Sequence, residues 1–178
     1  MNQAPMRFST SEFCKGWAAA SALALALLQG CSTSPGVLPT ESAPVAWRSE
    51  SSAQKGGDVA LYAMSMLDRD YRWGGKKLES GFDCSGLVTH VFRESLGLDL
   101  RGNAATLAQK AKPVNRQALQ PGDLLFFNTL GRPNSHVGIY VGKGQFVHAA
   151  NERSGVRINK LSERYYAARF EGAKTVLN

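Results

Sequence analysis

The sequence predicts an α+β fold in which N-terminal helices pack on an antiparallel β-sheet. Apolar residues recur at helical spacing in the region up to about residue 110. After Pro113 the apolar runs become short and are separated by Gly, Pro and Asn, which is typical of strands joined by turns. Helices first and a strand meander afterwards indicate the α+β class, whereas a parallel sheet would alternate the two kinds of element.

Three helices are expected. The domain is expected to begin near Ala53, and its first helix carries its apolar face over residues 59–67 and is expected to end near Asp70. After a turn at residues 71–75 (Tyr-Arg-Trp-Gly-Gly), Asp83 is expected to cap a second helix that stops at Gly97. A third, short helix is expected over residues 103–110.

Five apolar runs predict strands, at residues 123–127, 136–141, 145–149, 155–158 and 168–176. The second and third runs flank Gly-Lys-Gly and should form a hairpin. A hairpin centred on Gly142 would place His136 opposite His148. That centring needs a three-residue loop, because a two-residue loop shifts the register by one residue and needs a bulge to restore it.

Residues 1–30 are expected to be a secretory signal. Arg7 and Lys15 precede an apolar run at residues 17–28, and the small residue Gly30 follows it. The run is about a dozen residues long, shorter than the ~20 residues that a membrane-spanning helix needs.

Cys31 directly follows the small residue, which resembles the lipobox of bacterial lipoproteins. The resemblance implies that Cys31 is lipidated and anchors the chain to a membrane. Ser32, directly after the expected lipidated cysteine, resembles the residue at that position in lipoproteins sorted to the outer membrane. The expected location is therefore the bacterial cell envelope, at the outer membrane facing the periplasm. Residues 31–52 are expected to be the lipidated N-terminus and a flexible tether, and residues 53–178 a single domain. The alternative is an uncleaved apolar N-terminus with an incidental cysteine.

The chain carries a net charge of +7, which favours an anionic partner. Nucleic acid is not expected as a partner of an exported protein. Lysine and arginine are also scattered along the chain, so the charge is equally compatible with an ordinary solvated surface.

The cysteines single out one thiol. Cys14 would leave with the signal and Cys31 would carry lipid, so Cys84 remains as a thiol with no disulfide partner. Exported compartments oxidise thiols, and a thiol retained there is either buried and inert or kept for its reactivity. Cys84 falls at the first turn of a predicted helix, whose positive end favours the nucleophilic thiolate. Gly86 is expected to keep the nearby backbone uncrowded, so that N–H groups can face an oxyanion.

A base for this thiol must come from three histidines. His90 lies on the same helix as Cys84 and is interpreted as a surface or packing residue. His136 opens a predicted strand and can accept the thiol proton, while His148 orients its imidazole. Two alternatives stay open: ordinary hydrogen-bonded strand histidines, or a zinc site formed by Cys84, His136 and His148. The short spacings typical of zinc ligands are missing, so no metal and no cofactor are expected.

These residues together resemble the NlpC-type cysteine peptidases, papain-like bacterial cell-wall endopeptidases. The resemblance covers residues 53–176 and rests on motifs that occur in the family's order, namely Tyr-Arg-Trp-Gly-Gly (71–75), Phe-Asp-Cys-Ser-Gly-Leu-Val (82–88), Pro-Gly-Asp-Leu (121–124), His-Val-Gly-Ile-Tyr (136–140) and Phe-Val-His-Ala (146–149). It implies a papain-like fold with Cys84 as nucleophile, His136 as base and His148 as the third, polar member of the triad.

The resemblance also implies substrate-binding positions. Tyr71 matches a position beside the nucleophile, and Asp83 and Ser85 match positions that line the substrate groove and meet the amino groups of stem peptides. The alternatives are a packed aromatic side chain for Tyr71 and a plain helix cap for Asp83.

The implied reaction is hydrolysis of amide bonds in or between peptidoglycan stem peptides, through a thioacyl-enzyme. The implied bond is the cross-link between D-alanine and diaminopimelate or the bond between D-γ-glutamate and diaminopimelate. The alternatives are a wall amidase or acyltransferase that uses the same triad, and a non-catalytic wall-binding lipoprotein.

Overall fold

The computed structural model describes residues 49–177. The predicted signal, the lipidation site at Cys31 and nearly all of the predicted tether lie outside the described residues. Between residues 49 and 177, the structure contains no helix with the length and apolar character needed to cross a membrane.

The first helix, α1 (Glu50–Ser65), buries the apolar face that the sequence predicts. Its cap is Ser49, whose hydroxyl accepts the Ser52 N–H, so the helix starts three residues before Ala53. It ends earlier than the predicted Asp70. Asp68 adopts a positive φ of 64°, and its N–H bonds to the carbonyl of Val156 at 3.0 Å instead of continuing the helix.

The other two predicted helices are confirmed, with the caps that the sequence indicates. Asp83 caps α2 (Cys84–Leu96), and Gly97 ends it in the left-handed conformation at φ 67°. Asn103 caps α3 (Ala104–Lys110) through its side-chain oxygen.

Six strands form one antiparallel sheet in the order β3-β8-β4-β5-β6-β7. Their bounds are β3 (Lys112–Val114), β4 (Leu124–Phe127), β5 (His136–Gly142), β6 (Gln145–Asn151), β7 (Gly155–Lys160) and β8 (Phe170–Thr175). The five predicted strands are present, and the chain returns to insert β8 between β3 and β4. The sequence did not indicate β3, the small pair β1 (Lys76–Lys77) and β2 (Gly81–Phe82), the 3₁₀ turn η1 (Arg116–Ala118) or the short helix α4 (Arg164–Ala167).

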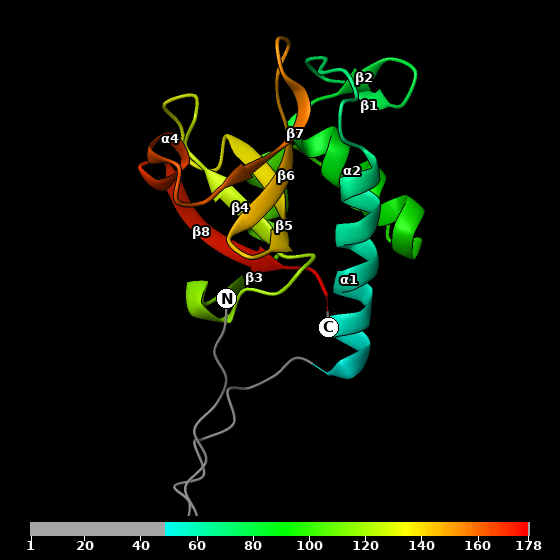
Figure 1. The fold of residues 1–178 in the computed structure, drawn as a ribbon, viewed down its shortest axis with the longest axis vertical. Coiled ribbons are helices and arrows are strands. Elements are labelled where there is room, and N and C mark those ends of the chain that lie inside the picture. The colour runs from blue at the N-terminus through cyan, green and yellow to red at the C-terminus, as the bar shows by residue number, and fades with distance from the viewer. Residues whose placement is uncertain (1–48, 178) are drawn as a thin grey trace, which may run out of the picture. The chain divides into compact units, whose positions relative to one another are not determined.

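The central strands β4, β5 and β6 are buried on both faces. Figure 1 shows α1 and α2 on one side of the sheet and α4 on the other. Leu124 and Phe126 point into the core beneath the helices. Leu125 and Phe127 point the opposite way, into a second, aromatic cluster that α4 joins through Tyr166. The α+β class and the packing of helices on an antiparallel sheet are therefore confirmed.

The β5–β6 hairpin differs from the expected register. Its loop is the two-residue turn Lys143-Gly144, in which both residues have positive φ. A bulge near the turn then restores the pairing, which continues with Tyr140 opposite Phe146. Extension of this register places His148 opposite Gly138. His136 lies two residues before Gly138 on β5, so the two histidines are diagonal neighbours. The prediction of directly opposed histidines was wrong, but the two stay on the same face because the shift is an even number of residues.

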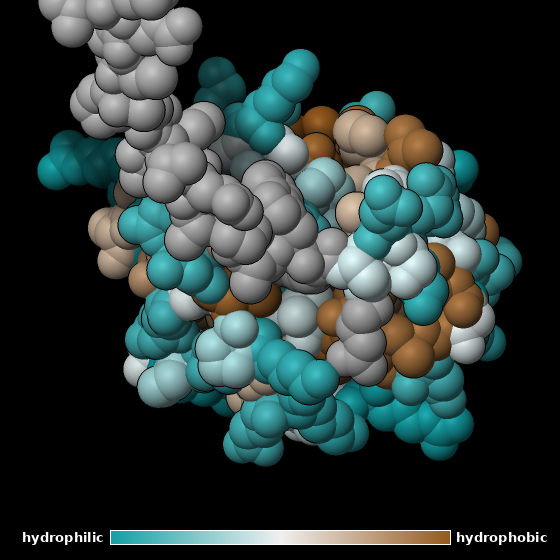
Figure 2. All heavy atoms as spheres, turned by 90° about the horizontal axis from the view of Figure 1, so that it is seen from below, coloured by the Kyte–Doolittle hydropathy of each residue, from teal (hydrophilic) through white to brown (hydrophobic). Residues whose placement is uncertain are grey.

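The surface of the described domain is mixed in character. Figure 2 shows groups of hydrophobic residues among a largely hydrophilic surface. Large apolar side chains that are exposed include Leu61, Trp73, Leu78, Leu130 and Tyr165. Of these, Trp73 is the most exposed, at 68%, and it borders the cavity described next.

Candidate active site

The start of α2 is held in place by one carboxylate. Asp83 Oδ1 accepts the Gly86 N–H at 2.6 Å and the Ser85 hydroxyl at 3.0 Å. Its Oδ2 accepts the Gly74 N–H at 3.1 Å. Asp83 is therefore the cap of α2, as the sequence indicates. Its hydrogen bond to Gly74 also holds the Trp-Gly-Gly turn next to the helix start, where Cys84 is the first residue.

Glycine at position 86 is required by packing against the same turn. The carbonyl of Gly75 accepts the Asp83 N–H at 3.0 Å, and a Cβ on Gly86 would lie 1.9 Å from that carbonyl oxygen. This backbone contact requires glycine at position 86, which is a packing reason that the sequence did not indicate.

The Cys84 thiol lies at the first turn of α2, partly buried and beside the start of β5. The backbone N–H groups of Val137, Ser85 and Cys84 itself stabilise its thiolate. Burial, assisted by the charge of Asp83, nevertheless raises the pKa of the thiol to about 11. The expected stabilisation of the thiolate by the helix end is therefore outweighed by desolvation.

His136 and His148 form a buried pair on the aromatic face of the sheet. His136 Nε2 lies 2.7 Å from His148 Nδ1, with the rings nearly perpendicular at 85°. His136 is 8% exposed and His148 is fully buried. Burial lowers the pKa of His136 to about 3 and that of His148 to about 4, so both rings are neutral at neutral pH.

The hydrogen bonds continue behind His148 to residues that the sequence analysis missed. His148 Nε2 lies 2.9 Å from Asn159 Oδ1 and 3.3 Å from the Tyr166 hydroxyl. Asn159 Nδ2 donates in turn to Glu163 Oε2 at 2.6 Å. The alternating pattern had predicted a strand that ended at residue 158, so Asn159 fell outside it, and no local signal marked Glu163 or Tyr166.

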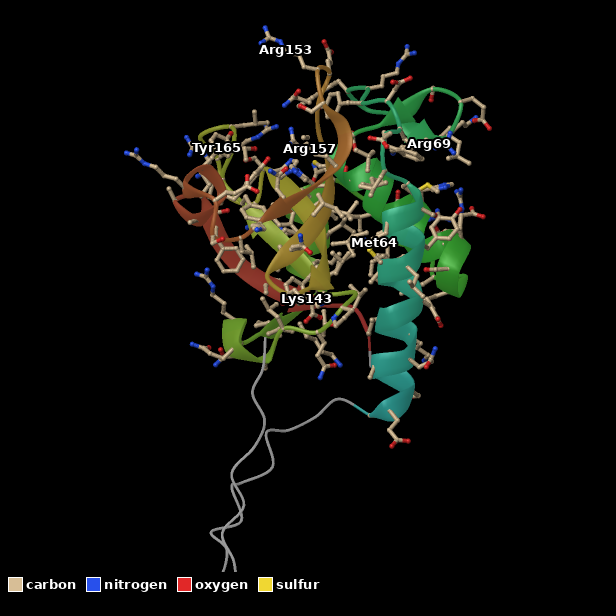
Figure 3. The ribbon with its side chains drawn as sticks, viewed as in Figure 1. Met64, Arg69, Lys143, Arg153, Arg157 and Tyr165 are labelled. Atoms are coloured by element: carbon tan, nitrogen blue, oxygen red, sulfur yellow. The ribbon has the colours of Figure 1, made fainter. Side chains whose placement is uncertain are left out.

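A cavity of about 340 Å³ opens in front of Cys84. Tyr71, Trp73, Asp83 and Ser85 lie on its walls, together with residues 103–105 and 132–135. A second hollow of about 490 Å³ lies open to solvent and is lined by Tyr71, Trp73, Asn151, Glu152 and Arg153. Figure 3 shows Arg153 at the tip of the β6–β7 connection, next to the loops around β1 and β2.

The structure brings together all six predicted site residues of the domain. Cys84, Tyr71, Asp83 and Ser85 share the cavity. His136 adjoins it through its neighbours, since Ser135 lines the cavity and the Val137 N–H meets the thiol. His148 stands behind His136. Tyr71 lines the same cavity as Cys84. Burial raises the pKa of Tyr71, and a negative charge on Cys84 or Asp83 raises it further.

Two other interpretations of the histidines can be compared with the geometry. His90 is 5% exposed and packs between Tyr62 and Phe82, so it is a packing residue. A zinc site would need the predicted ligands to converge on one point, but His136 and His148 share a hydrogen bond instead. Within residues 49–177, no three His, Cys, Asp or Glu side chains are grouped so as to hold a metal ion.

Comparison with known proteins agrees with this arrangement. Residues 68–175 match the NlpC/P60 family, and this range contains the thiol, both histidines and the cavity walls. The chain belongs to the NlpC/P60 family. The murein DD-endopeptidase MepH of Escherichia coli K12 is 37% identical to it over 70% of this chain and 47% of that protein. The murein DD-endopeptidase MepS/murein LD-carboxypeptidase of the same strain is 43% identical over 61% and 56%. The chain thus spans about half the length of these relatives.

Solved NlpC/P60 structures share the fold. An NlpC/P60 family protein from Bacillus cereus superimposes with a TM-score of 0.64 and 27% identity, over 69% of this chain and 40% of that one. The NlpC/P60 domain of the peptidoglycan hydrolase SagA gives a TM-score of 0.59 and 28% identity, over 68% and 98%. The papain-like arrangement predicted for this NlpC/P60 domain is therefore confirmed.

The charge of Asp83 should be measurable in the reactivity of the thiol. Asp83→Asn keeps an oxygen to cap Gly86 and removes the negative charge that helps to raise the pKa of Cys84. We expect the pH profile of iodoacetamide alkylation to shift to lower pH in this variant of the NlpC/P60 domain. Glu94→Gln, at the far end of α2, is the control and should leave the profile in place. An unchanged or upward-shifted profile in Asp83→Asn would contradict this prediction.

The buried histidines should make the NlpC/P60 domain sensitive to acid. Burial lowers the pKa of His136 and His148 from their ordinary value of 6.5 to about 3 and about 4. At pH values between the folded and the unfolded pKa, the histidines bind more protons in the unfolded chain than in the folded one. The free energy of unfolding should therefore fall as the pH falls below about 6.5. We expect a loss of roughly 2 kcal/mol or more by about pH 4.5 in urea titrations.

The control for acid sensitivity is a double variant, His136→Gln with His148→Gln, which contains every carboxylate of the parent. Its stability should depend less steeply on pH over the same interval. An equally steep dependence would assign the acid sensitivity to the carboxylates instead.

Proposed function

We propose that this protein is a cysteine endopeptidase of peptidoglycan, with Cys84 as nucleophile, His136 as general base and His148 as the residue that orients the base. The observation that carries the proposal is the thiol at the first turn of α2, in the wall of a 340 Å³ cavity and against the strand that begins with His136. The relatives named murein DD-endopeptidases support the substrate class.

In the proposed reaction the resting pair is a neutral thiol and a neutral imidazole. His136 takes the thiol proton as Cys84 Sγ attacks the amide carbonyl, and the carbonyl oxygen becomes an oxyanion. Backbone N–H groups at the start of α2 have no partner inside the helix and can donate to that oxygen, with Tyr71 beside them. His136 then gives its proton to the leaving amine, and water hydrolyses the thioacyl-enzyme with His136 again as base.

The proposed substrate is a stem peptide lying across Tyr71 and Trp73, where the two hollows meet. Ser85 and Asp83 lie on the wall beside the thiol and are proposed to meet its amino groups. Asp83 already accepts three hydrogen bonds within the chain, so its contribution there is mainly negative charge.

We propose the D-alanine–diaminopimelate cross-link as the bond that is cut, because MepH and MepS are both named DD-endopeptidases. The second candidate is the γ-glutamyl bond. It is favoured by a gamma-DL-glutamyl hydrolase of Bacillus subtilis, which is 39% identical over 65% of this chain and 28% of that protein. The lipid anchor at Cys31 and a place at the outer membrane, facing the periplasm, complete the proposal and rest on the lipobox resemblance.

The test is digestion of purified cross-linked peptidoglycan by the protein and by Cys84→Ala, with the released fragments identified by mass. Loss of cross-linked dimers that depends on Cys84 is the expected result. New L-alanyl-D-glutamate ends would assign the γ-glutamyl bond, and release of a whole stem peptide from the glycan would assign an amidase. Equal digests from the two proteins would overturn the enzymatic proposal in favour of a binding protein.

A further inference from the structure

A chain of hydrogen bonds leads from the proposed base to the surface of the domain. His136 on β5, His148 on β6 and Asn159 on β7 are linked at 2.7 and 2.9 Å, and Asn159 reaches Glu163 at 2.6 Å. The first three side chains are buried, with Asn159 8% exposed, whereas Glu163 is exposed. A solvent-facing carboxylate is therefore connected to the buried imidazole through two intermediate side chains.

The carboxylate of Glu163 is committed to this chain. Glu163 is the cap residue of α4, yet its side chain makes no capping bond to that helix. Its Oε1 instead accepts the Lys160 N–H at 2.7 Å, and its Oε2 accepts the Asn159 amide. A carboxylate can only accept, so Asn159 must present its NH₂ group to Glu163 and its carbonyl oxygen to His148.

This orientation fixes the hydrogen on each imidazole. The Asn159 oxygen is an acceptor, so His148 must carry its hydrogen on Nε2. Burial lowers the pKa of His148 to about 4, so the ring is neutral and has one N–H. Its Nδ1 is then an acceptor, and His136 must donate from Nε2. His136 Nδ1 is left with a lone pair, which is what a base for the Cys84 proton requires.

The hydrogen bonds between Asn159, His148 and His136 could also form with donors and acceptors exchanged. The Tyr166 hydroxyl lies 3.3 Å from His148 Nε2 and can either donate or accept. If Asn159 no longer offered its oxygen, Tyr166 could donate to Nε2 and the hydrogen of His148 would move to Nδ1. His148 would then donate to His136 Nε2, the hydrogen of His136 would stand on Nδ1, and the base could not accept the thiol proton.

We propose that Glu163, acting through Asn159, is a positioning residue that sets the direction of the hydrogen bonds and so holds His136 in the tautomer able to accept the Cys84 proton. Only one proton moves in the step: it leaves the Cys84 thiol and binds His136 Nδ1, while the Nε2 hydrogen stays in its bond to His148. Glu163 touches neither the substrate nor the reacting atoms. The catalytic meaning of this inference rests on the proposed function, whereas the tautomer itself can be observed without it.

The test is ¹⁵N NMR of the histidine rings in the purified protein, at a pH well above both histidine pKa values, with steady-state kinetics on the same samples. We compare the wild type with Asn159→Leu, which removes the acceptor, and with Glu163→Gln, which lets the Asn159 amide turn over. Glu94→Ala is the matched control, because Glu94 is also a hydrogen-bonded surface carboxylate but lies on α2 next to Arg93. Adding Asn159→Asp to Glu163→Gln gives position 159 an acceptor that cannot turn over.

The expected result is a hydrogen on His136 Nε2 in the wild type and in Glu94→Ala, and on Nδ1 for part or all of the population in Asn159→Leu and Glu163→Gln. In these two variants kcat should fall by about 100-fold or more with KM changed little, because the wrong tautomer disables the base and not the groove. The double variant should regain the Nε2 tautomer.

A wild type with its hydrogen on Nδ1, or variants whose His136 tautomer matches the wild type, would overturn the inference whatever their activity. Failure of the proposed function looks different. The NMR shifts would follow the pattern above, while the wild type would release no fragment that depends on Cys84.

Discussion

Cys84→Ser is expected to retain the fold and to lose peptidoglycan hydrolysis by at least about a thousandfold. Serine fits the space of the thiol at the first turn of α2, where it is an ordinary helix-start residue. A hydroxyl is far less acidic than a thiol, and neutral His136 is not basic enough to make up that difference. The measurement is the rate of release of soluble fragments, together with the melting temperature.

The control for Cys84→Ser is Ser95→Ala, a change near the end of the same helix at a hydroxyl that donates to the Val91 carbonyl. It should leave turnover near that of the wild type. Turnover by Cys84→Ser within tenfold of the wild type would refute the thioacyl mechanism, provided that both proteins melt at similar temperatures.

Gly86→Ala is expected to be among the most destabilising single-methyl additions in the domain, with a loss of about 3 kcal/mol or more in the free energy of unfolding. The added Cβ would lie 1.9 Å from the Gly75 carbonyl oxygen, which is backbone and is already bonded to the Asp83 N–H. Relief therefore requires the Trp-Gly-Gly turn and the helix start to separate. Urea unfolding followed by circular dichroism measures the change.

Gly57→Ala is the matched control, because Gly57 lies inside α1 and a Cβ there would meet nothing within 4 Å. Alanine is favoured over glycine in a helix, so this variant should be more stable by roughly 0.5–1 kcal/mol. If Gly86→Ala were as stable as the wild type, the close packing of α2 on the turn would be incorrect.

The features that could be predicted from the sequence are those set by local chemistry. Asp83 and Asn103 cap helices because their short side chains reach the backbone N–H three residues ahead, and Gly97 ends α2 because the left-handed conformation there favours glycine. The two ends of the site, Cys84 at a helix start and His136 at a strand start, follow from such signals.

The features that could not be predicted depend on contacts between distant segments. The insertion of β8 between β3 and β4 joins residues 43 to 63 positions apart, and no local pattern indicates it. The register of the β5–β6 hairpin depends on whether Lys143 accepts a positive φ, which few side chains favour. Asn159 and Glu163 became part of the site only once β7 lay beside β6, so their polar character alone could not identify them.

The raised pKa of Cys84 has a consequence for the chemical stability of the proposed nucleophile while no substrate is bound. Peroxides and disulfides react with the thiolate, and a thiol with a pKa of about 11 is almost wholly protonated at neutral pH. In the oxidising compartment that the proposed export implies, the thiol is therefore held in the form that oxidants attack least. In the proposed reaction the thiol loses its proton to His136 only when a peptide carbonyl is in place, and the sulfur then bonds to that carbonyl carbon.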